Sequence, residues 1–368
     1  MEFSAMTMNM FFPDYEDPAE DHRIIEMAAK QSVWFAELGY HPWFTDHHLR
    51  GPWHSNPLQF AAYVVPMLPP DRFIGFGVLS IPFYHPLRLV ESMNLLDQLT
   101  KGKTLFGLGS GWQGSEAEAL GMDGEYHASG RAAEDTLDVM QRLWAFRTGD
   151  SEYSFAVGFN KGRIKRRVMP APYRMPHPTI IRTASRDSGL IRAAQKGWPA
   201  FLGIFGANLQ QQTQLYRRAL ADARHPPEVV ETCLRWCSYD WQSVTLAPTD
   251  EEARAREMRA HADRDAIRAR YYQRHGQIYG PMPNRKETAG DAYAARGEIS
   301  ETIAGSPDTV AAKVQALLDI GINHLHLRFA GEIAGETRDI YEASATLFAK
   351  EVMPRFIHAT PLREAAAP

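Results

Sequence analysis

The sequence predicts an α/β fold, a TIM (β/α)8 barrel, and three observations indicate it. Strand-like and helix-like segments alternate from the start of the chain, the pattern of a parallel sheet with helical crossovers. Roughly eight strands can be counted, each followed by a helix, as in a barrel. The length of 368 residues suits one barrel with insertions. A doubly wound open sheet is the competing fold, but strand number and length both favour closure.

The first half of the expected barrel follows from apolar runs bounded by Gly, Pro and capping residues. Gly39 is suited to ending a helix, and Asn56-Pro57 is a cap followed by a first-turn proline. Strands are expected at 6–12, 40–45, 72–81 and 104–108, and helices at 21–38, 57–67, 87–99, 115–120 and 130–145.

The second half is expected to contain strands at 179–183, 200–205, 233–246 and 324–328, with a helix at 187–195. Two long segments interrupt the alternation, 148–178 and 254–300, and we expect them to be insertions near the mouth of the barrel that determine the substrate. The basic run 161–167 in the first insertion is expected to be a solvated loop. We expect one domain over 1–368 with a disordered tail at about 360–368.

Composition excludes several classes of protein. Hydrophobic residues make up 44% and charged residues 23%, which is typical of a globular chain. A net charge of −4 gives no basic surface for nucleic acid. We expect no membrane span and no signal peptide, and therefore a cytoplasmic protein. Cys233 and Cys237 have no further cysteine partners and are expected to be reduced thiols.

Candidate catalytic residues follow the second strand, because the working groups of a TIM barrel lie at the C-terminal ends of its strands. That strand ends in Asp46, His47 and His48. Histidine suits proton exchange near neutral pH, and strand alternation allows one imidazole of the pair to face the barrel axis. In one alternative both imidazoles cap loops. In another the three residues bind a metal with His54, but no ligand spacing requires it, and we expect no metal.

The turn after the fourth strand is rich in glycine. Residues 107–112 read Gly-Leu-Gly-Ser-Gly-Trp, and glycine lets the backbone approach a planar or phosphorylated ligand. The run does not fit the dinucleotide fingerprint G-x-G-x-x-G. We assign Gly109 and Ser110 to cofactor contact; an ordinary tight turn is the alternative.

The turn after the fifth strand is suited to a phosphate. Ser185 and Arg186 lie where a helix is expected to begin, with Gly189 in its first turn. A hydroxyl, a guanidinium and free helix amides together can bind a phosphate group. Ordinary capping by Ser185 or Asp187 is the alternative.

Several further motifs occur in a specific order along the chain, over about residues 3–330. They are 36–40 (Ala-Glu-Leu-Gly-Tyr), Asp46-His47-His48, His85-Pro86, 96–103 (Leu-Asp-Gln-Leu-Thr-Lys-Gly-Lys), 106–112, Glu116, Arg131 with Glu134, Pro176-His177-Pro178, 305–310 (Gly-Ser-Pro-Asp-Thr-Val) and Gly321-Ile322. This order resembles the luciferase-like flavin-dependent monooxygenase family, the bacterial luciferase-like TIM-barrel oxidoreductases. That family usually has Glu at the position of Asp46 and Ser-x-Gly-Arg at 100–103, and these departures are mild.

The resemblance implies roles for particular residues. His47 would be catalytic, supported by His48, while Ser185 and Arg186 would hold the flavin phosphate. The third strand around Gly77 and Val78 would support the isoalloxazine ring, where family members often have a strained peptide. Residues expected to exclude water or contact substrate are Trp53, Trp112, Tyr126, Phe155, Phe159 and Arg328; core packing is the alternative for the aromatic ones.

The resemblance also implies a reaction. Reduced FMN and O2 would form a flavin peroxide or hydroperoxide that inserts one oxygen atom into a small organic substrate, a carbonyl compound or another. A separate NAD(P)H:flavin reductase would supply reduced FMN, and a homodimer or higher oligomer is expected. The alternatives are a deazaflavin-dependent oxidoreductase of the same fold that transfers hydride without oxygen, a non-catalytic binding barrel, and a metal-dependent hydrolase.

Overall fold

The computed structural model describes residues 1–7, 17–46, 55–111, 114–183, 187–203, 208–279, 303–331 and 336–357. Its strands are β1 (Glu2–Met6), β2 (His41–Phe44), β3 (Ile74–Ser80), β4 (Thr104–Gly109), β5 (Tyr153–Val157), β6 (Asn160–Ile164), β7 (Ile180–Thr183), β8 (Ala200–Leu202), β9 (Ser238–Leu246), β10 (Ile303–Gly305) and β11 (His324–Phe329). The main sheet has the order β10-β9-β11-β1-β2-β3-β4-β7-β8, and an additional pairing joins β9 to β8. These pairings close a ring of eight strands, with β10 attached to β9, and so confirm the predicted TIM barrel.

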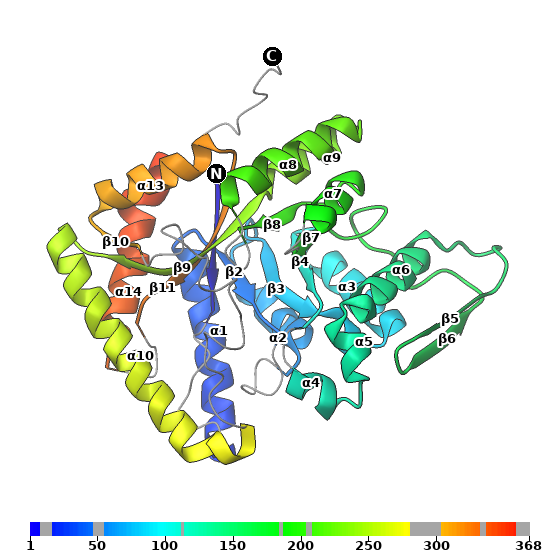
Figure 1. Cartoon of the computed structure of the whole chain (residues 1–368), viewed down its shortest axis with the longest axis horizontal. Helices are drawn as coiled ribbons and strands as arrows, with labels where there is room; N and C mark the ends of the chain where they lie inside the picture. The colour runs from blue at the N-terminus through cyan, green and yellow to red at the C-terminus, as the bar shows by residue number, and fades with distance from the viewer. Residues whose placement is uncertain are drawn as a thin grey trace. The chain divides into compact units, whose positions relative to one another are not determined.

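Helices follow most of the strands, as the alternation predicts (Figure 1). The α-helices are α1 (Asp21–Glu37), α2 (Pro57–Val64), α3 (Pro86–Leu99), α4 (Gly114–Ala119), α5 (Gly124–Ala128), α6 (Arg131–Ala145), α7 (Asp187–Gln195), α8 (Leu209–Asp222), α9 (Pro227–Arg235), α10 (Asp250–Tyr279), α13 (Pro307–Asp319) and α14 (Arg338–Leu347). Short 3₁₀ turns lie at Pro18–Glu20, Val65–Met67, Ile81–Phe83 and Met353–Arg355, and a π-helical turn at Phe348–Val352. None of the helices in the described ranges is both long and apolar enough to cross a membrane.

Two expected strands were placed wrongly. The first strand is β1 at Glu2–Met6 and not 6–12, of which 8–12 lie outside the described residues. Ser4 is polar although it is buried, so β1 does not stand out in the sequence as an apolar run. The expected strand 233–246 begins only at Ser238, because Pro227 starts α9, which runs through Cys233. Proline in the first turn of a helix is a common start signal, and Pro227 provides it here.

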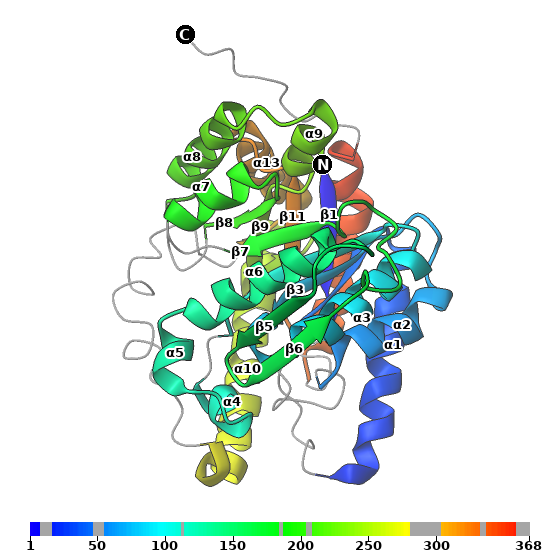
Figure 2. The same ribbon diagram turned by 90° about the vertical axis from the view of Figure 1, so that its right-hand side faces the viewer.

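The first insertion contains a hairpin instead of the expected solvated loop at 161–167. Strands β5 and β6 pair antiparallel from Tyr153–Ile164 to Val157–Asn160, and Figure 2 shows them side by side. Asn160 and Ile164 are buried while Lys161 and Arg163 are exposed, the alternation of a strand with one covered face. The second insertion begins within a helix, because its residues 254–279 form most of α10.

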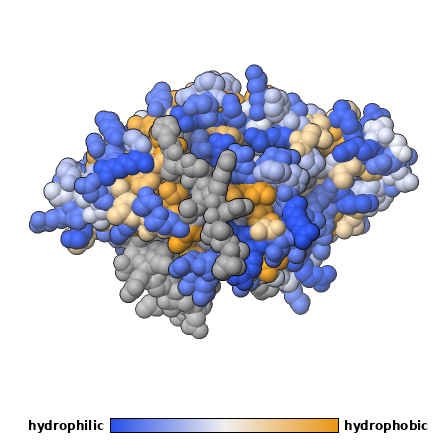
Figure 3. Space-filling view, turned by 90° about the horizontal axis from the view of Figure 1, so that it is seen from above, coloured by the Kyte–Doolittle hydropathy of each residue, from blue (hydrophilic) through white to orange (hydrophobic). Residues whose placement is uncertain are grey.

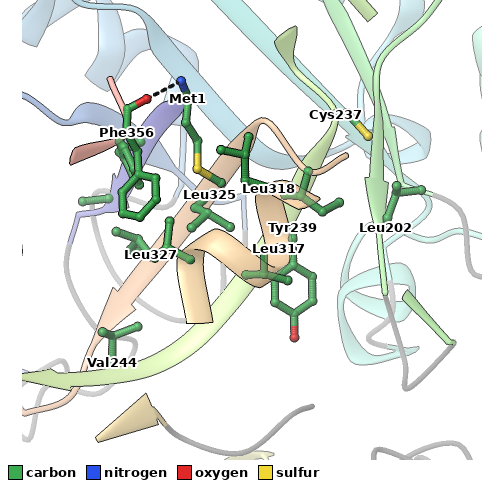
Figure 4. Close-up of a cluster of buried hydrophobic side chains, with 14 of the residues drawn as sticks. Met1, Leu202, Cys237, Tyr239, Val244, Leu317, Leu318, Leu325, Leu327 and Phe356 are labelled. Atoms are coloured by element: carbon green, nitrogen blue, oxygen red, sulfur yellow. Dashed lines mark hydrogen bonds between the residues drawn. The ribbon is translucent and has the colours of Figure 1, made fainter. Parts of the chain in front are cut away.

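The chain packs as two compact units. One comprises 1–18, 34–42 and 181–368, and the other comprises 19–33 and 43–180. Figure 4 shows part of the core of the first unit, where Leu325 and Leu327 of β11 lie among apolar side chains of β9 and α13. On the face drawn in Figure 3, hydrophilic residues cover most of the surface. The expectation of a single domain stays a prediction.

A buried histidine joins three strands of the first unit. His324 of β11 is fully buried, and its Nε2 and Nδ1 each lie 2.6 Å from a serine hydroxyl, of Ser4 in β1 and Ser238 in β9 respectively. The Ser238 hydroxyl donates to the carbonyl of Trp236 over 2.7 Å, so it accepts from Nδ1–H. Burial is the main cause that lowers the pKa of His324 well below 6.5, so the imidazole is neutral. Because its one proton is on Nδ1, Nε2 accepts from the Ser4 hydroxyl, and both nitrogens are hydrogen-bonded.

Aromatic packing positions the strands of the second unit. The rings of Phe76 in β3 and Phe106 in β4 stack with centroids 5.1 Å apart. A Cβ at Gly75 would lie 1.8 Å from the Trp43 indole, and one at Gly77 would lie 2.1 Å from its Nε1. The two glycines of β3 therefore make room for the Trp43 side chain, which β2 contributes.

Candidate active site

Asp46 follows β2 and is bonded to the end of β3. Its carboxylate is buried, and Oδ2 accepts from the backbone N–H of Ser80 over 3.0 Å and from the hydroxyl of Tyr84 over 2.9 Å. Its own backbone N–H donates to the carbonyl of Val78 over 3.2 Å. These three bonds fix the chain at the residue that precedes the predicted catalytic histidines.

Tyr84 was not among the predicted site residues. Burial is the main cause that raises its pKa far above 10, and the carboxylates of Asp46 and Glu116 raise it further. The hydroxyl therefore keeps its proton and stays a hydrogen-bond donor at any physiological pH. Glu116, on α4, is itself fully buried. The signal in the sequence is that Tyr84 directly precedes His85-Pro86, one of the motifs on which the family resemblance rests.

The end of β3 carries a buried hydroxyl that fits a ligand. Ser80 is 1% exposed, and its Oγ finds no hydrogen-bond partner among the described residues. An unpaired buried hydroxyl costs about 1–3 kcal/mol, so a polar ligand atom at this strand end would relieve the cost. The Gly77–Val78 peptide in the same strand is cis, and both residues are partly buried. A flavin, which has several ring nitrogens and carbonyls, is compatible with such a partner.

The turn after β4 is shaped by neighbouring aromatic groups. Gly109 is buried and Ser110 is exposed. The carbonyl of Ser110 accepts from Nε2 of His127 over 3.0 Å, and the His127 ring stacks on Phe83 at 5.4 Å. Gly111 has φ of +70°, and a Cβ there would lie 2.9 Å from Phe83. Glycine is therefore required at 111 for conformation and for packing, whether or not a ligand binds.

The predicted aromatic residues of the second unit lie on α5 and the hairpin. Phe155 is buried against His85, with ring centroids 5.8 Å apart. Tyr126 donates its hydroxyl to Asp135 over 2.7 Å, and burial, followed by this bond, raises its pKa to about 12. Phe159, in the hairpin turn, is 48% exposed, so it shields little on its own.

Two further predicted residues lie in the first unit. Gly189 is in the first turn of α7 and is partly buried, as expected for a helix that starts at Asp187. Arg328 lies in β11 and is also partly buried. The remaining predicted residues lie outside the described residues, so their roles stay predictions: His47, His48, Trp53, Trp112, Ser185 and Arg186.

Metal-ligating side chains do not gather in the part of the chain that the structure describes. No group of three or more His, Cys, Asp or Glu side chains there could hold a metal ion. Both cysteines are buried free thiols, and burial raises the pKa of Cys233 to about 11 and that of Cys237 to about 12. The expectation that both remain reduced stays a prediction.

Comparison with known sequences identifies the family of this chain. A family described as luciferase-like monooxygenase matches residues 1–324. The chain belongs to the luciferase-like monooxygenase family. It is 25% identical over 338 residues to 4-hydroxyprotoasukamycin monooxygenase of Streptomyces nodosus subsp. asukaensis, covering 88% of this chain and 84% of that protein. Family membership supports an oxidoreductase of the monooxygenase type.

A second relative is similar over a shorter stretch. Limonene 1,2-monooxygenase of Rhodococcus erythropolis is 34% identical over 115 residues, covering 31% of this chain and 28% of that protein. This alignment therefore spans less than a third of the relative's length. The substrate in its name cannot be transferred to this chain on that ground.

Solved structures share the fold. The monooxygenase RslO1 of Streptomyces bottropensis superposes with a TM-score of 0.71 at 20% identity, covering 97% of this chain and 100% of its own. The oxygenating constituent of 3,6-diketocamphane monooxygenase from Pseudomonas putida, in complex with FMN, gives 0.68 at 19%, covering 97% and 99%. An F420-dependent secondary alcohol dehydrogenase gives 0.61 at 15%, covering 96% and 98%. At these identities the likeness establishes the barrel and not the cofactor.

Proposed function

We propose that this chain is a flavin-dependent monooxygenase that uses reduced FMN and O2 to insert one oxygen atom into a small organic substrate, such as a carbonyl compound. The observation that carries the proposal is the family match over residues 1–324. The buried polar group at the ends of β2 and β3, where TIM-barrel enzymes keep their working residues, supports it. The FMN complex of one structural neighbour agrees with this choice of cofactor.

Reduced FMN, when bound, supplies the two electrons with which one atom of O2 enters the substrate while the other leaves as water. We assign Ser185, Arg186 and the amides near Gly189 to its phosphate group. Ser80 offers a buried hydroxyl to a polar atom of the ligand. A buried hydrogen bond of this kind orients a ligand, because another orientation would leave the Ser80 hydroxyl and the ligand atom without a partner.

Proton handling is assigned to the segment after β2. We propose that His47 holds or exchanges a proton near the reacting oxygen and that His48 supports it, since imidazole titrates near neutral pH. Asp46 anchors this segment through its bonds to Ser80 and Tyr84. We propose that Tyr126 and Phe155 help to keep water from the reaction, together with Trp53, Trp112 and Phe159.

The experiment is aerobic turnover with a separate flavin reductase, NADH and FMN, using a panel of aldehydes and ketones under ¹⁸O2. We expect a product that is heavier by one ¹⁸O atom, and at least tenfold less of it from His47→Gln. Absence of labelled product from every substrate would contradict the proposal. NADH oxidation by the chain and FMN without the reductase would contradict the two-component arrangement.

A deazaflavin-dependent oxidoreductase is the second candidate. The likeness to F420-dependent enzymes of the same fold favours it. Such an enzyme would transfer a hydride without consuming oxygen. Reduced deazaflavin offered anaerobically with ketones distinguishes the two, because only the second candidate would oxidise it while forming an alcohol.

A further inference from the structure

We infer that Tyr84 is a positioning residue through which the β5–β6 hairpin holds the Asp46 carboxylate in place. The inference rests on the proposed function only in taking Asp46 to belong to the active site. Tyr84 donates its hydroxyl to Oδ2 of Asp46 over 2.9 Å, and its carbonyl oxygen accepts from Nδ2 of Asn160 over 3.2 Å. One residue is thus bonded both to the segment after β2 and to the first residue of β6.

The hairpin is attached at a second, adjacent point. Nε2 of His85 donates to the carbonyl oxygen of Lys161 over 3.2 Å, because a carbonyl oxygen can only accept. The His85 ring also packs edge-on against Phe155 of β5. Two consecutive residues after β3 are therefore bonded to two consecutive residues of β6. Paired contacts of this kind fix the register of the hairpin against the chain and leave it little freedom to slide.

The other end of the connection is the carboxylate. Oδ2 of Asp46 has two donors, the Tyr84 hydroxyl and the Ser80 amide, and the side chain is 5% exposed. Hydrogen bonds to a charged acceptor are about twice as strong as neutral ones, so the hydroxyl contributes strongly to the orientation of the carboxylate. Phenylalanine at 84 would fill the same space and remove the hydroxyl donor of Oδ2. The carboxylate could then rotate, and the Ser80 amide would lose the rigid acceptor that protects it.

Through these hydrogen bonds, the hairpin of the first insertion also helps to position a residue of the proposed active site. A hairpin at the edge of an active site is commonly assigned to substrate choice. Here the backbone and the Asn160 amide of the hairpin also support a residue that precedes the predicted catalytic pair. A substitution in β6 at a residue that does not contact substrate would therefore still lower the rate of reaction.

The first test measures hydrogen exchange of the Ser80 amide in the whole protein without flavin. We expect Tyr84→Phe to speed this exchange by about tenfold and Asn160→Ala by about threefold. Tyr63→Phe is the matched control, because it also removes a hydroxyl bonded to a carboxylate, that of Glu26 at 2.7 Å on the surface. It should leave Ser80 unchanged. Unaltered exchange in both Tyr84→Phe and Asn160→Ala would overturn the inference.

The second test uses turnover as set out above. Tyr84→Phe should lower kcat by about 10- to 100-fold with KM within about threefold, because misplacement of an active-site group affects the reacting geometry more than binding. Tyr84→Phe with Asn160→Ala should match Tyr84→Phe alone, since both act on one connection. Additive losses would overturn the inference. If the wild-type chain yields no oxygenated product, the proposed function fails, and Ser80 exchange still decides the role of Tyr84.

Should Tyr84→Phe fail to fold, Asn160→Ala carries both measurements. It removes one hydrogen bond from the hairpin to a backbone carbonyl and leaves the tyrosine in place. A change in Ser80 exchange then supports the connection, and the lack of one overturns it.

Discussion

Replacing His324 by glutamine should make the stability of the protein less sensitive to mild acid. Glutamine keeps a donor and an acceptor for Ser4 and Ser238 but cannot take up a proton. In the native protein the imidazole is buried and neutral, and its pKa lies well below 6.5. The unfolded chain binds a proton near the ordinary value, so stability from this residue is fully present above 6.5 and is lost as pH falls toward the native pKa.

The size of the effect follows from the ordinary histidine pKa. At pH 5.5 the unfolded state gains at most about 1.4 kcal/mol from protonating this one side chain, and at pH 7.5 it gains almost nothing. Urea unfolding at the two pH values measures the difference. Between pH 7.5 and pH 5.5, wild-type protein should lose up to about 1.4 kcal/mol more than His324→Gln.

The comparison of the two proteins cancels contributions from titratable groups that do not interact with His324. Burial also lowers the pKa values of His177 and His261, and both titrate equally in wild type and variant. At pH 7.5 the variant should already be less stable by about 1–2 kcal/mol, because glutamine fits two 2.6 Å hydrogen bonds less well. An equal loss of stability on acidification in both proteins would refute the account of a neutral, doubly bonded imidazole.

Three further outcomes are expected. Asp97→Asn should lower the free energy of unfolding by about 2–3 kcal/mol in urea titrations, because the buried carboxylate accepts from Thr104 over 2.6 Å and from a backbone amide over 2.9 Å; unchanged stability would contradict this. Ser80→Ala should raise the unfolding free energy without ligand by about 1–3 kcal/mol, because it removes a buried hydroxyl that has no partner, yet weaken FMN binding about tenfold in a fluorescence titration, and equal affinity would remove Ser80 from the site. Cys233 and Cys237 should react with a thiol reagent at pH 8 only after denaturation, because both are buried with raised pKa values; rapid labelling of native protein would disprove it.

The barrel could be predicted from the sequence because its local signals agree with its tertiary structure. The helix that ends before Gly39 and the Asn56 side chain that accepts from the Gln59 amide are both as the residue types indicate. The start of the first strand was misplaced because a long-range contact overrides the local pattern. Ser4 is polar but buried, because it meets His324 from the far end of the chain, and no window around residue 4 contains that information.

In the candidate site, too, a residue's local position could be read from the sequence, but its distant contacts could not. Asp46 was identified because it follows a strand, and strand position can be read locally. Tyr84 was missed because its importance comes from two partners, one 38 and the other 76 positions away. The strand around Gly77 and Val78 was expected to support the flavin ring, and this stays a prediction, but the atoms nearest to a Cβ at Gly75 or Gly77 belong to Trp43. A glycine in the sequence indicates that another group occupies the place of its side chain, but it does not identify that group.

The fit between Trp43 and the two glycines links three positions that are distant in sequence. A side chain at 75 or 77 fits only if residue 43 is smaller than tryptophan. A smaller residue at 43, with glycine kept at 75 and 77, leaves a cavity beside β3. In protein engineering, these three positions should therefore be varied together. Trp43→Phe combined with Gly77→Ala is a reasonable first design, because it shifts volume from β2 to β3 and reshapes the strand end that carries Ser80.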